Sequence, residues 1–356
     1  MQLLEQTVSK IEPQSSEYRQ MAEEHILNLT MPRWALGMVL DLAVDLAGIT
    51  RSLSPAVKQK NIVLMAGDHG IIEEGVSEQP QAITVQMIYN FIGRGAGINV
   101  LAHNAGAHVT VVDMGVNNSL KDLVASGKVI DKKIAYGTKN FAKGPAMTRE
   151  QAVASIEAGI EIAYRLSPHT DIFGTGEMGI CNTSPSSAII AVLTGTDDVA
   201  AVVDRGAGLP VEKLPQKAAA IRKGIELNRP DPGDGIDVLS KVGGFEIGGI
   251  AGLILGAAAL KKPVMVDGFI STAGALIANS ICPLSKEYMI AAHGSMEKGH
   301  RPMLDILGKK PLLDLNLRLG EGTGAALAMH IVDAAAAVMK NMATFSKAGV
   351  SNTGIK

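Results

Sequence analysis

Four short segments of the 356-residue chain combine glycine with carboxylate, amide, hydroxyl or ammonium side chains, the groups that bind phosphates and move protons. They are residues 65–75, 173–183, 204–209 with Lys217 beyond them, and 317–325. Glycine is frequent, at 39 residues, and its missing side chain lets a ligand approach the backbone closely. The sequence therefore predicts a ligand site assembled from segments that lie far apart in the chain.

Two carboxylates in these segments are candidates for proton transfer. Glu177 lies in the second segment, and Glu321 lies between Gly320 and Gly322 just before a helical pattern. Flanking glycines leave little bulk to crowd an approaching ligand, and a carboxylate in a partly desolvated pocket has a raised pKa and can act as a general base. Both residues could instead be solvated loop carboxylates, or anions favoured by a nearby helix start.

The second segment also contains a G-x-G-x-x-G pattern, formed by Gly174, Gly176 and Gly179 after an expected strand. In dinucleotide sites these glycines let the backbone approach a pyrophosphate at a helix start. Glu177 would add negative charge beside that pyrophosphate. A dinucleotide-dependent oxidoreductase therefore remains only a secondary interpretation.

The third segment and two residues beyond it resemble the parts of a phosphate site. Gly206 and Gly208 can offer backbone N–H groups, Lys217 an ammonium and Ser295 a hydroxyl. The structural alternatives are a surface turn for the glycines, an ordinary exposed lysine, and a helix N-cap for the serine.

Composition excludes several classes of protein. Lys and Arg total 33 against 35 Asp and Glu, which gives a formal charge of −2, and aromatic residues make up 3%, so we expect no nucleic-acid partner. The longest uncharged apolar stretch, residues 247–260, is too short for a membrane span.

The eight histidines form no ligand-spaced cluster, so we predict no metal. Two cysteines far apart suit the reducing cytoplasm.

The elements that must position these residues alternate between short apolar runs and helical patterns. Continuous hydrophobicity predicts strands buried on both faces. These strands are expected at residues 62–66, 109–113, 171–173, 199–204, 263–267 and 288–292. A helix is expected over residues 148–166, which open with a Thr-x-x-Gln capping signature. The fold class is therefore α/β, a Rossmann-like parallel sheet flanked by helices, with ligands at the carboxyl ends of the strands.

The two chain ends are expected to be helical, with no clear strand. We predict that residues 1–55 and 300–356 pack together as a smaller helical domain, because neither segment buries its apolar face alone. Residues 56–299 would form the large α/β domain.

Residues 231–250, 266–271 and 318–327 resemble the nicotinate-nucleotide:dimethylbenzimidazole phosphoribosyltransferase family, and the likeness runs from about residue 61 to residue 345. The resemblance implies transfer of 5-phosphoribosyl from nicotinate mononucleotide to an aromatic base of a cobamide, which yields an α-riboside phosphate and nicotinate. It implies a dimer of a Rossmann-like domain with a small helical domain, and it requires no cofactor.

The resemblance also implies roles for individual residues. Glu321 in the R-L-G-E-G motif matches the family's proposed base. The matching positions around the two substrates and the donor phosphate are Glu177, Gly179, Asn182, Gly206, Gly208, Lys217, Ser295, Gln86 and Leu319.

The chain departs from the family pattern at two places. Residues 31–37 read MPRWALG where the family usually carries KPPGSLG, and residues 76–80 read VSEQP near the expected acceptor pocket. The acceptor is therefore left open among a benzimidazole-type, a phenolic and a purine base. The partner is left open between a second identical chain and a paralogous subunit, and a non-catalytic subunit of a heteromeric transferase remains an alternative.

Overall fold

A computed structural model describes residues 1–351. Its central feature is a six-stranded sheet in the order β3-β2-β1-β4-β5-β6, in which every neighbouring pair is parallel. The strands are β1 Lys60–Gly67, β2 Ala107–Gly115, β3 Ile130–Asp131, β4 Ile172–Met178, β5 Val264–Val266 and β6 Met289–Ala291. Because the strand order reverses between β1 and β4, the sheet is doubly wound, and such sheets bind ligands at the carboxyl ends of their strands. The predicted fold class is confirmed.

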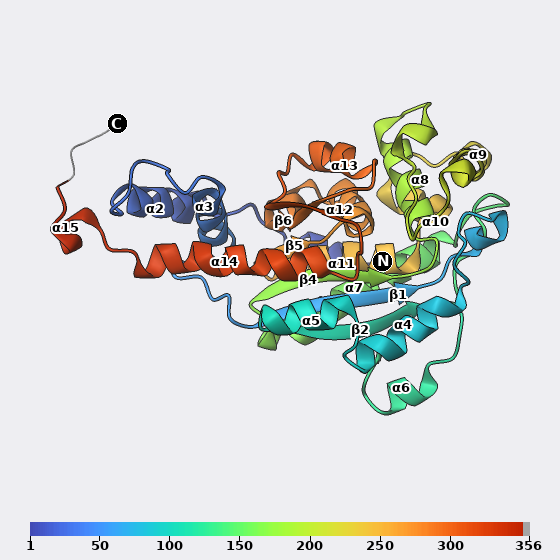
Figure 1. The fold of residues 1–356 in the computed structure, drawn as a ribbon, viewed down its shortest axis with the longest axis horizontal. Coiled ribbons are helices and arrows are strands. Elements are labelled where there is room, and N and C mark those ends of the chain that lie inside the picture. The colour runs from blue at the N-terminus through green and yellow to red at the C-terminus, as the bar shows by residue number, and fades with distance from the viewer. Residues whose placement is uncertain (352–356) are drawn as a thin grey trace.

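Helices cover both faces of the sheet, as the continuous apolar runs predict (Figure 1). Successive residues of β1 point to opposite faces, so Ile62 and Leu64 join one apolar cluster while Val63 and Met65 join another. The first cluster includes residues of α3 Met38–Thr50, α4 Ala82–Ile92, α5 Gly97–Asn104 and α14 Thr323–Asn341. The second includes residues of α7 Arg149–Leu166, α8 Thr183–Thr194, α10 Gly235–Val242, α11 Phe245–Ala259 and α12 Phe269–Ile281.

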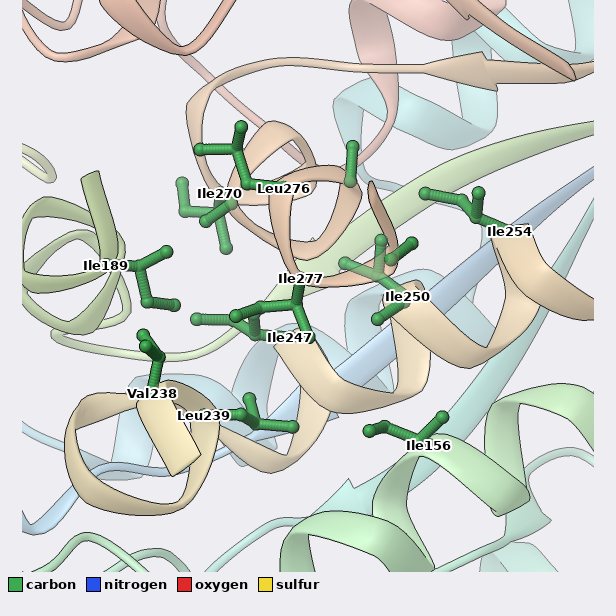
Figure 2. Packing of buried hydrophobic residues seen from close by; sticks show 14 of the residues in the cluster. Ile156, Ile189, Val238, Leu239, Ile247, Ile250, Ile254, Ile270, Leu276 and Ile277 are labelled. Atoms are coloured by element: carbon green, nitrogen blue, oxygen red, sulfur yellow. The ribbon is translucent and has the colours of Figure 1, made fainter. Parts of the chain in front are cut away.

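The apolar stretch 247–260 forms most of α11, a helix buried on all sides. Glycine allows α11 to lie close to α7, because a Cβ on Gly252 would come within 1.9 Å of the Ile156 carbonyl oxygen. Figure 2 shows Ile156 of α7 below Ile247 and Ile250 of α11. Across residues 1–351, no helix is both long and apolar enough to span a membrane.

Six further α-helices lie within residues 1–351. They are α1 Gln2–Val8, α2 Ser16–Leu27, α6 Lys121–Ala125, α9 Leu214–Asn228, α13 His300–Leu307 and α15 Phe345–Ala348. Helices α2 and α3 pack together beside α14 (Figure 1), and an isolated bridge joins Leu29 to Thr344. Helix α1 lies instead on α7, where Thr7 Oγ1 is 2.9 Å from the Tyr164 hydroxyl. The division into two domains stays a prediction.

Two expectations about local structure are wrong. Residues 199–204 do not form a strand, because Val199–Val202 is a 3₁₀ helix. Val199, Val202 and Val203 are buried, a spacing that buries one face of a helical turn. The C-terminal segment is also not wholly helical, because β8 Leu313–Leu317 pairs in parallel with β7 His293–Ser295.

The predicted capping signature is confirmed at the start of α7. Thr148 Oγ1 accepts a hydrogen bond from the Gln151 backbone N–H at 3.2 Å, and Gln151 Oε1 accepts one from the Thr148 backbone N–H at 3.0 Å. These reciprocal bonds satisfy N–H groups that the first turn leaves without helical partners.

Candidate active site

A cavity of about 330 Å³ opens at the carboxyl ends of β4 and β5, between β7, α8 and the start of α14. Its lining includes seven of the predicted site residues, namely Glu177, Gly179, Asn182, Gly206, Ser295, Leu319 and Glu321. Three of the four segments recognised in the sequence therefore meet in the lining of one cavity. The first segment, residues 65–75, lies beneath this lining and is not part of it.

Glu177 lies near the end of β4 and is not a solvated loop residue, since only 6% of it is exposed. Its Oε1 accepts a hydrogen bond from the Glu321 backbone N–H at 3.3 Å, and its Oε2 accepts one from the Asn182 side-chain amide. Burial, reinforced by the nearby Asp267 carboxylate, raises the pKa of Glu177 to about 8. Glu177 is therefore largely protonated at neutral pH.

Glu321 lies two residues before α14 and is also buried, with a left-handed φ of 62°. Its Oε2 accepts a hydrogen bond from the Ile98 backbone N–H at 3.0 Å, in the first turn of α5. Burial raises the pKa of Glu321, although the Ile98 N–H favours the charged form. The carboxylate therefore interacts with the start of another helix, and its raised pKa suits a general base.

Asp267 is a third carboxylate at this place, and none of the motifs singled out in the sequence includes it as a site residue. It follows β5, and its two oxygens accept hydrogen bonds from the Gly322 N–H at 3.1 Å and the Ala325 N–H at 2.9 Å. These bonds fix the start of α14 and hence the position of Glu321. His293 Nε2 lies 3.7 Å from Asp267 Oδ1. An aspartate directly after a buried parallel strand was the available signal.

The glycines of the G-x-G-x-x-G pattern do not form a loop around a pyrophosphate. Gly174 and Gly176 lie inside β4. A Cβ on Gly176 would come within 2.5 Å of the Glu321 carbonyl oxygen, and one on Gly174 within 3.0 Å of Met329. These glycines let α14 pack directly on the strand. The dinucleotide interpretation therefore loses its structural basis.

Lys217 is not an ordinary exposed lysine, because only 1% of it is accessible. Its ammonium donates hydrogen bonds to Thr183 Oγ1 and to the Asp204 carbonyl oxygen, each at 2.8 Å. Because Thr183 lines the cavity, Lys217 lies directly beside the site. An ammonium has three N–H donors, so one remains for a ligand. Burial lowers the pKa of Lys217, whereas the neighbouring Glu297 carboxylate favours its charge. Gly208 is exposed and outside the cavity lining.

Ser295 lies in β7 and does not cap a helix, because α13 begins only at His300. The Ser295 backbone N–H donates to His300 Nδ1 at 2.8 Å, and Ser295 Oγ accepts from the Glu297 backbone N–H at 3.3 Å. Burial, followed by the nearby His293, lowers the pKa of His300 to about 3, so this imidazole is neutral. Its other nitrogen lies 2.9 Å from Thr272 Oγ1.

Gln86 is another predicted residue that the structure does not bring into the cavity lining. It is exposed on α4, whereas Ile83 and Met87 of the same helix line the cavity. Of the two segments that depart from the family pattern, residues 76–80 contribute Gln79 to the lining and residues 31–37 contribute nothing.

A buried acid–base pair lies beneath the lining, formed by His69 of the first predicted segment and Glu246 of α11. His69 Nε2 is 2.8 Å from Glu246 Oε1, and both side chains are almost fully enclosed. A Cβ on Gly179 would come within 3.3 Å of His69 Nε2. Within residues 1–351, no three His, Cys, Asp or Glu side chains gather as a metal-binding group.

A larger hollow of about 870 Å³ lies on α4, α5 and β2, away from these residues. Its lining includes Arg94, His103, His108 and Lys128 but no aspartate or glutamate. Of these two hollows, only the smaller is lined by carboxylates and adjoins a buried ammonium, which suits an anionic ligand bound beside a second ligand that has a proton to lose.

Comparison with known proteins agrees with this geometry. Residues 11–350 match the phosphoribosyltransferase family. Nicotinate-nucleotide–dimethylbenzimidazole phosphoribosyltransferases of Syntrophotalea carbinolica and Desulfotalea psychrophila are 57% and 55% identical to the chain over 352 residues, covering 99% of every chain compared. The crystal structure of such an enzyme from Thermus thermophilus superposes with a TM-score of 0.88 at 39% identity, over 95% of this chain and 99% of that one. The chain belongs to the phosphoribosyltransferase family.

Proposed function

We propose that the protein transfers 5-phosphoribosyl from nicotinate mononucleotide to an aromatic base destined to be the lower ligand of a cobamide. The relatives named above carry this donor and dimethylbenzimidazole in their names. The observation that carries the proposal is the placement of the buried Glu321 carboxylate in one cavity with Ser295 and Gly206, next to the Lys217 ammonium.

The chemistry explains why the site combines carboxylates with a group that binds phosphate. The nicotinate ring of the donor is a pyridinium, so it leaves with the bonding electron pair as a neutral nitrogen and needs no strong acid. Positive charge develops on the ribose, and the Glu321 carboxylate, when ionised, stabilises it. The acceptor attacks C1′ from the opposite face, which converts the β-nucleotide into an α-product, and Glu321 takes the proton that the acceptor loses.

Incubation of the purified chain with nicotinate mononucleotide and, in separate reactions, dimethylbenzimidazole, phenol or p-cresol tests this function. With at least one of these bases, chromatography should show nicotinate and an α-riboside phosphate formed in equal amounts. Nicotinate release without the riboside would mean that the protein is a hydrolase. No release with any base would favour the non-catalytic subunit.

The acceptor itself is a narrower proposal. The altered residues 76–80, with Gln79 in the lining, support a base other than dimethylbenzimidazole, and phenolic bases are the main candidates. Parallel assays with dimethylbenzimidazole, phenol and p-cresol decide between them. Exclusive use of benzimidazoles would overturn the phenolic assignment.

We further propose that the chain works as a dimer in the cytoplasm, with itself or with a paralogous subunit. The exposed apolar side chains of Tyr89 and Val100, beside the larger hollow on α4 and α5, support an interface there. Cys181 and Cys282 are buried free thiols, as expected in a reducing compartment. Light scattering on the purified chain, alone and mixed with any paralogue, measures the assembly.

A further inference from the structure

Glu297 lies in the part of the cavity to which the proposed function assigns the donor phosphate, beside Gly206 and Lys217. Only 8% of the residue is exposed, and it lines the cavity. Its Oε1 accepts a hydrogen bond from the Gly206 backbone N–H at 3.1 Å. Its Oε2 is buried and has no hydrogen-bond partner within the described part of the chain. A buried acceptor without a donor is costly, so such an oxygen indicates a ligand that brings a donor.

The charges around Glu297 make a fully ionised phosphate a poor fit. The groups that act on its carboxylate are Lys217 from α9, Asp204 from the preceding loop and Arg318 after β8. Arg318 also lines the cavity, but its side chain is exposed, so water screens its charge. The charges of Lys217 and Glu297 cancel when both groups are ionised. His300, three residues after Glu297, is neutral and adds no positive charge. A dianion would therefore meet a carboxylate with little net positive charge to offset the repulsion.

A shared proton removes this repulsion. A phosphomonoester has a second pKa of about 6, so it retains one P–O–H donor at small cost near neutral pH. A phosphodiester and inorganic sulfate have no such proton. Burial raises the pKa of Glu297, whereas the Lys217 ammonium opposes this rise, so the carboxylate shares a proton more readily than an exposed glutamate does.

We propose that Glu297 is a specificity-determining residue of the donor site, whose carboxylate accepts a hydrogen bond from a protonated phosphomonoester and so selects terminal phosphates over phosphodiesters and sulfate. This rests on the proposed function, in which the donor phosphate binds beside Gly206 and Lys217. It also accounts for a carboxylate within an anion site, since a carboxylate repels every anion that cannot carry a proton.

The test compares inorganic phosphate with sulfate by isothermal titration calorimetry on the full chain. The wild-type protein should bind phosphate at least about tenfold more tightly than sulfate, the weight of one hydrogen bond to a charged group. Glu297→Gln should reduce that ratio to about threefold or less, mainly by strengthening sulfate binding, because the amide can donate to an unprotonated oxygen. Glu212→Gln, which removes an exposed carboxylate before α9, should leave the ratio unchanged.

Raising the pH from about 6 to about 9 supplies a second measurement that needs no variant. Phosphate should lose affinity for the wild-type protein more steeply than sulfate does, because only phosphate loses the shared proton. Equal slopes would overturn the proposal even if Glu297→Gln failed to fold. So would a wild-type protein that binds sulfate as tightly as phosphate.

A third outcome would assign Glu297 a different partner. If Glu297→Gln kept the preference for phosphate but lost affinity for nicotinate mononucleotide, Oε2 would accept from a ribose hydroxyl and the proposal would be wrong. The transferase assay separates this failure from that of the proposed function. A chain that releases no nicotinate with any base lacks the activity, whatever its ratio of phosphate to sulfate binding.

Discussion

The two ends of the cavity use their charges in opposite ways. At the acidic end, Glu177, Asp267 and Glu321 each accept at least one hydrogen bond from a main-chain N–H group, and these donors lie at the start of α14 or of α5. At the proposed phosphate end, Lys217 and Glu297 form a neighbouring pair of opposite charge, and one oxygen of Glu297 lacks a partner within residues 1–351.

The difference shows that the carboxylates of the acidic end are preorganised, whereas the Lys217–Glu297 pair needs a ligand to satisfy its hydrogen bonds. Main-chain donors are fixed by the fold, so the acidic end holds its carboxylates in place before any substrate arrives, as efficient proton transfer requires. The phosphate end is completed only when a ligand donates to Glu297. Substitutions at the acidic end should therefore lower turnover, whereas loss of the Lys217 ammonium should lower donor affinity and loss of the Glu297 carboxylate should change which anions bind.

Replacing Glu321 with glutamine should have the largest effect. The amide cannot take the acceptor proton, so kcat should fall by about 10²–10⁴-fold, the usual weight of general-base catalysis. Binding of nicotinate mononucleotide should persist, because the phosphate end is unchanged. Steady-state kinetics and calorimetry measure the two quantities, with the exposed Glu226→Gln as a matched control. An unchanged kcat would remove Glu321 from the role of base.

Replacing Lys217 with methionine should raise the KM for nicotinate mononucleotide by about 10-fold to 100-fold, the weight of a hydrogen bond to a charged group. The change in kcat should be smaller, because the acidic end stays intact. Lys213→Met is the control, since Lys213 is a half-exposed lysine one turn earlier that pairs with Glu78. A Lys217 variant with normal donor affinity would show that the phosphate binds elsewhere.

The contrast between the two ends also shows what the sequence could reveal. The layers of the fold follow from apolar runs in β1, β2 and β4, because burial on both faces leaves a continuous pattern. Glu321 and Glu177 stand out in the sequence because glycines surround them. Their burial was not predictable, since it depends on α14 packing against Gly174 and Gly176, and a sequence pattern does not distinguish a glycine that admits a helix from one that admits a ligand.

Other residues of the site carry weaker local signals. Asp267 acts through bonds to residues 55 and 58 positions later, a separation that no local motif reveals. Glu297 stands two residues after Ser295, yet its importance comes from Gly206, which lies 91 positions away. Gln86 is expected at the site from the family resemblance alone, and the turn of α4 leaves it exposed between Ile83 and Met87.

Replacing Glu177 with glutamine should change how stability depends on pH. The pKa of Glu177 rises from an ordinary value of 4.5 to about 8 on folding, so between these values the folded protein holds a proton that the unfolded chain releases. The wild-type free energy of unfolding, relative to the variant, is therefore largest below pH 4.5 and falls as pH rises toward 8, with a limit of about 1.4 kcal/mol per pH unit. Urea unfolding at several pH values measures this slope, and a stability difference that rises with pH would contradict it.

Replacing Gln86 with alanine should have the smallest effect and tests whether one chain completes its own acceptor pocket. Gln86 is exposed beside the cavity but outside its lining, so loss of one solvated amide should raise the acceptor KM by no more than about threefold, the range of a typical surface substitution. Met87→Ala, which removes a lining side chain from the same helix, should have the larger effect on this KM. The reverse order would mean that a ligand or a second subunit covers Gln86, and the acceptor end would then extend beyond the cavity that a single chain provides.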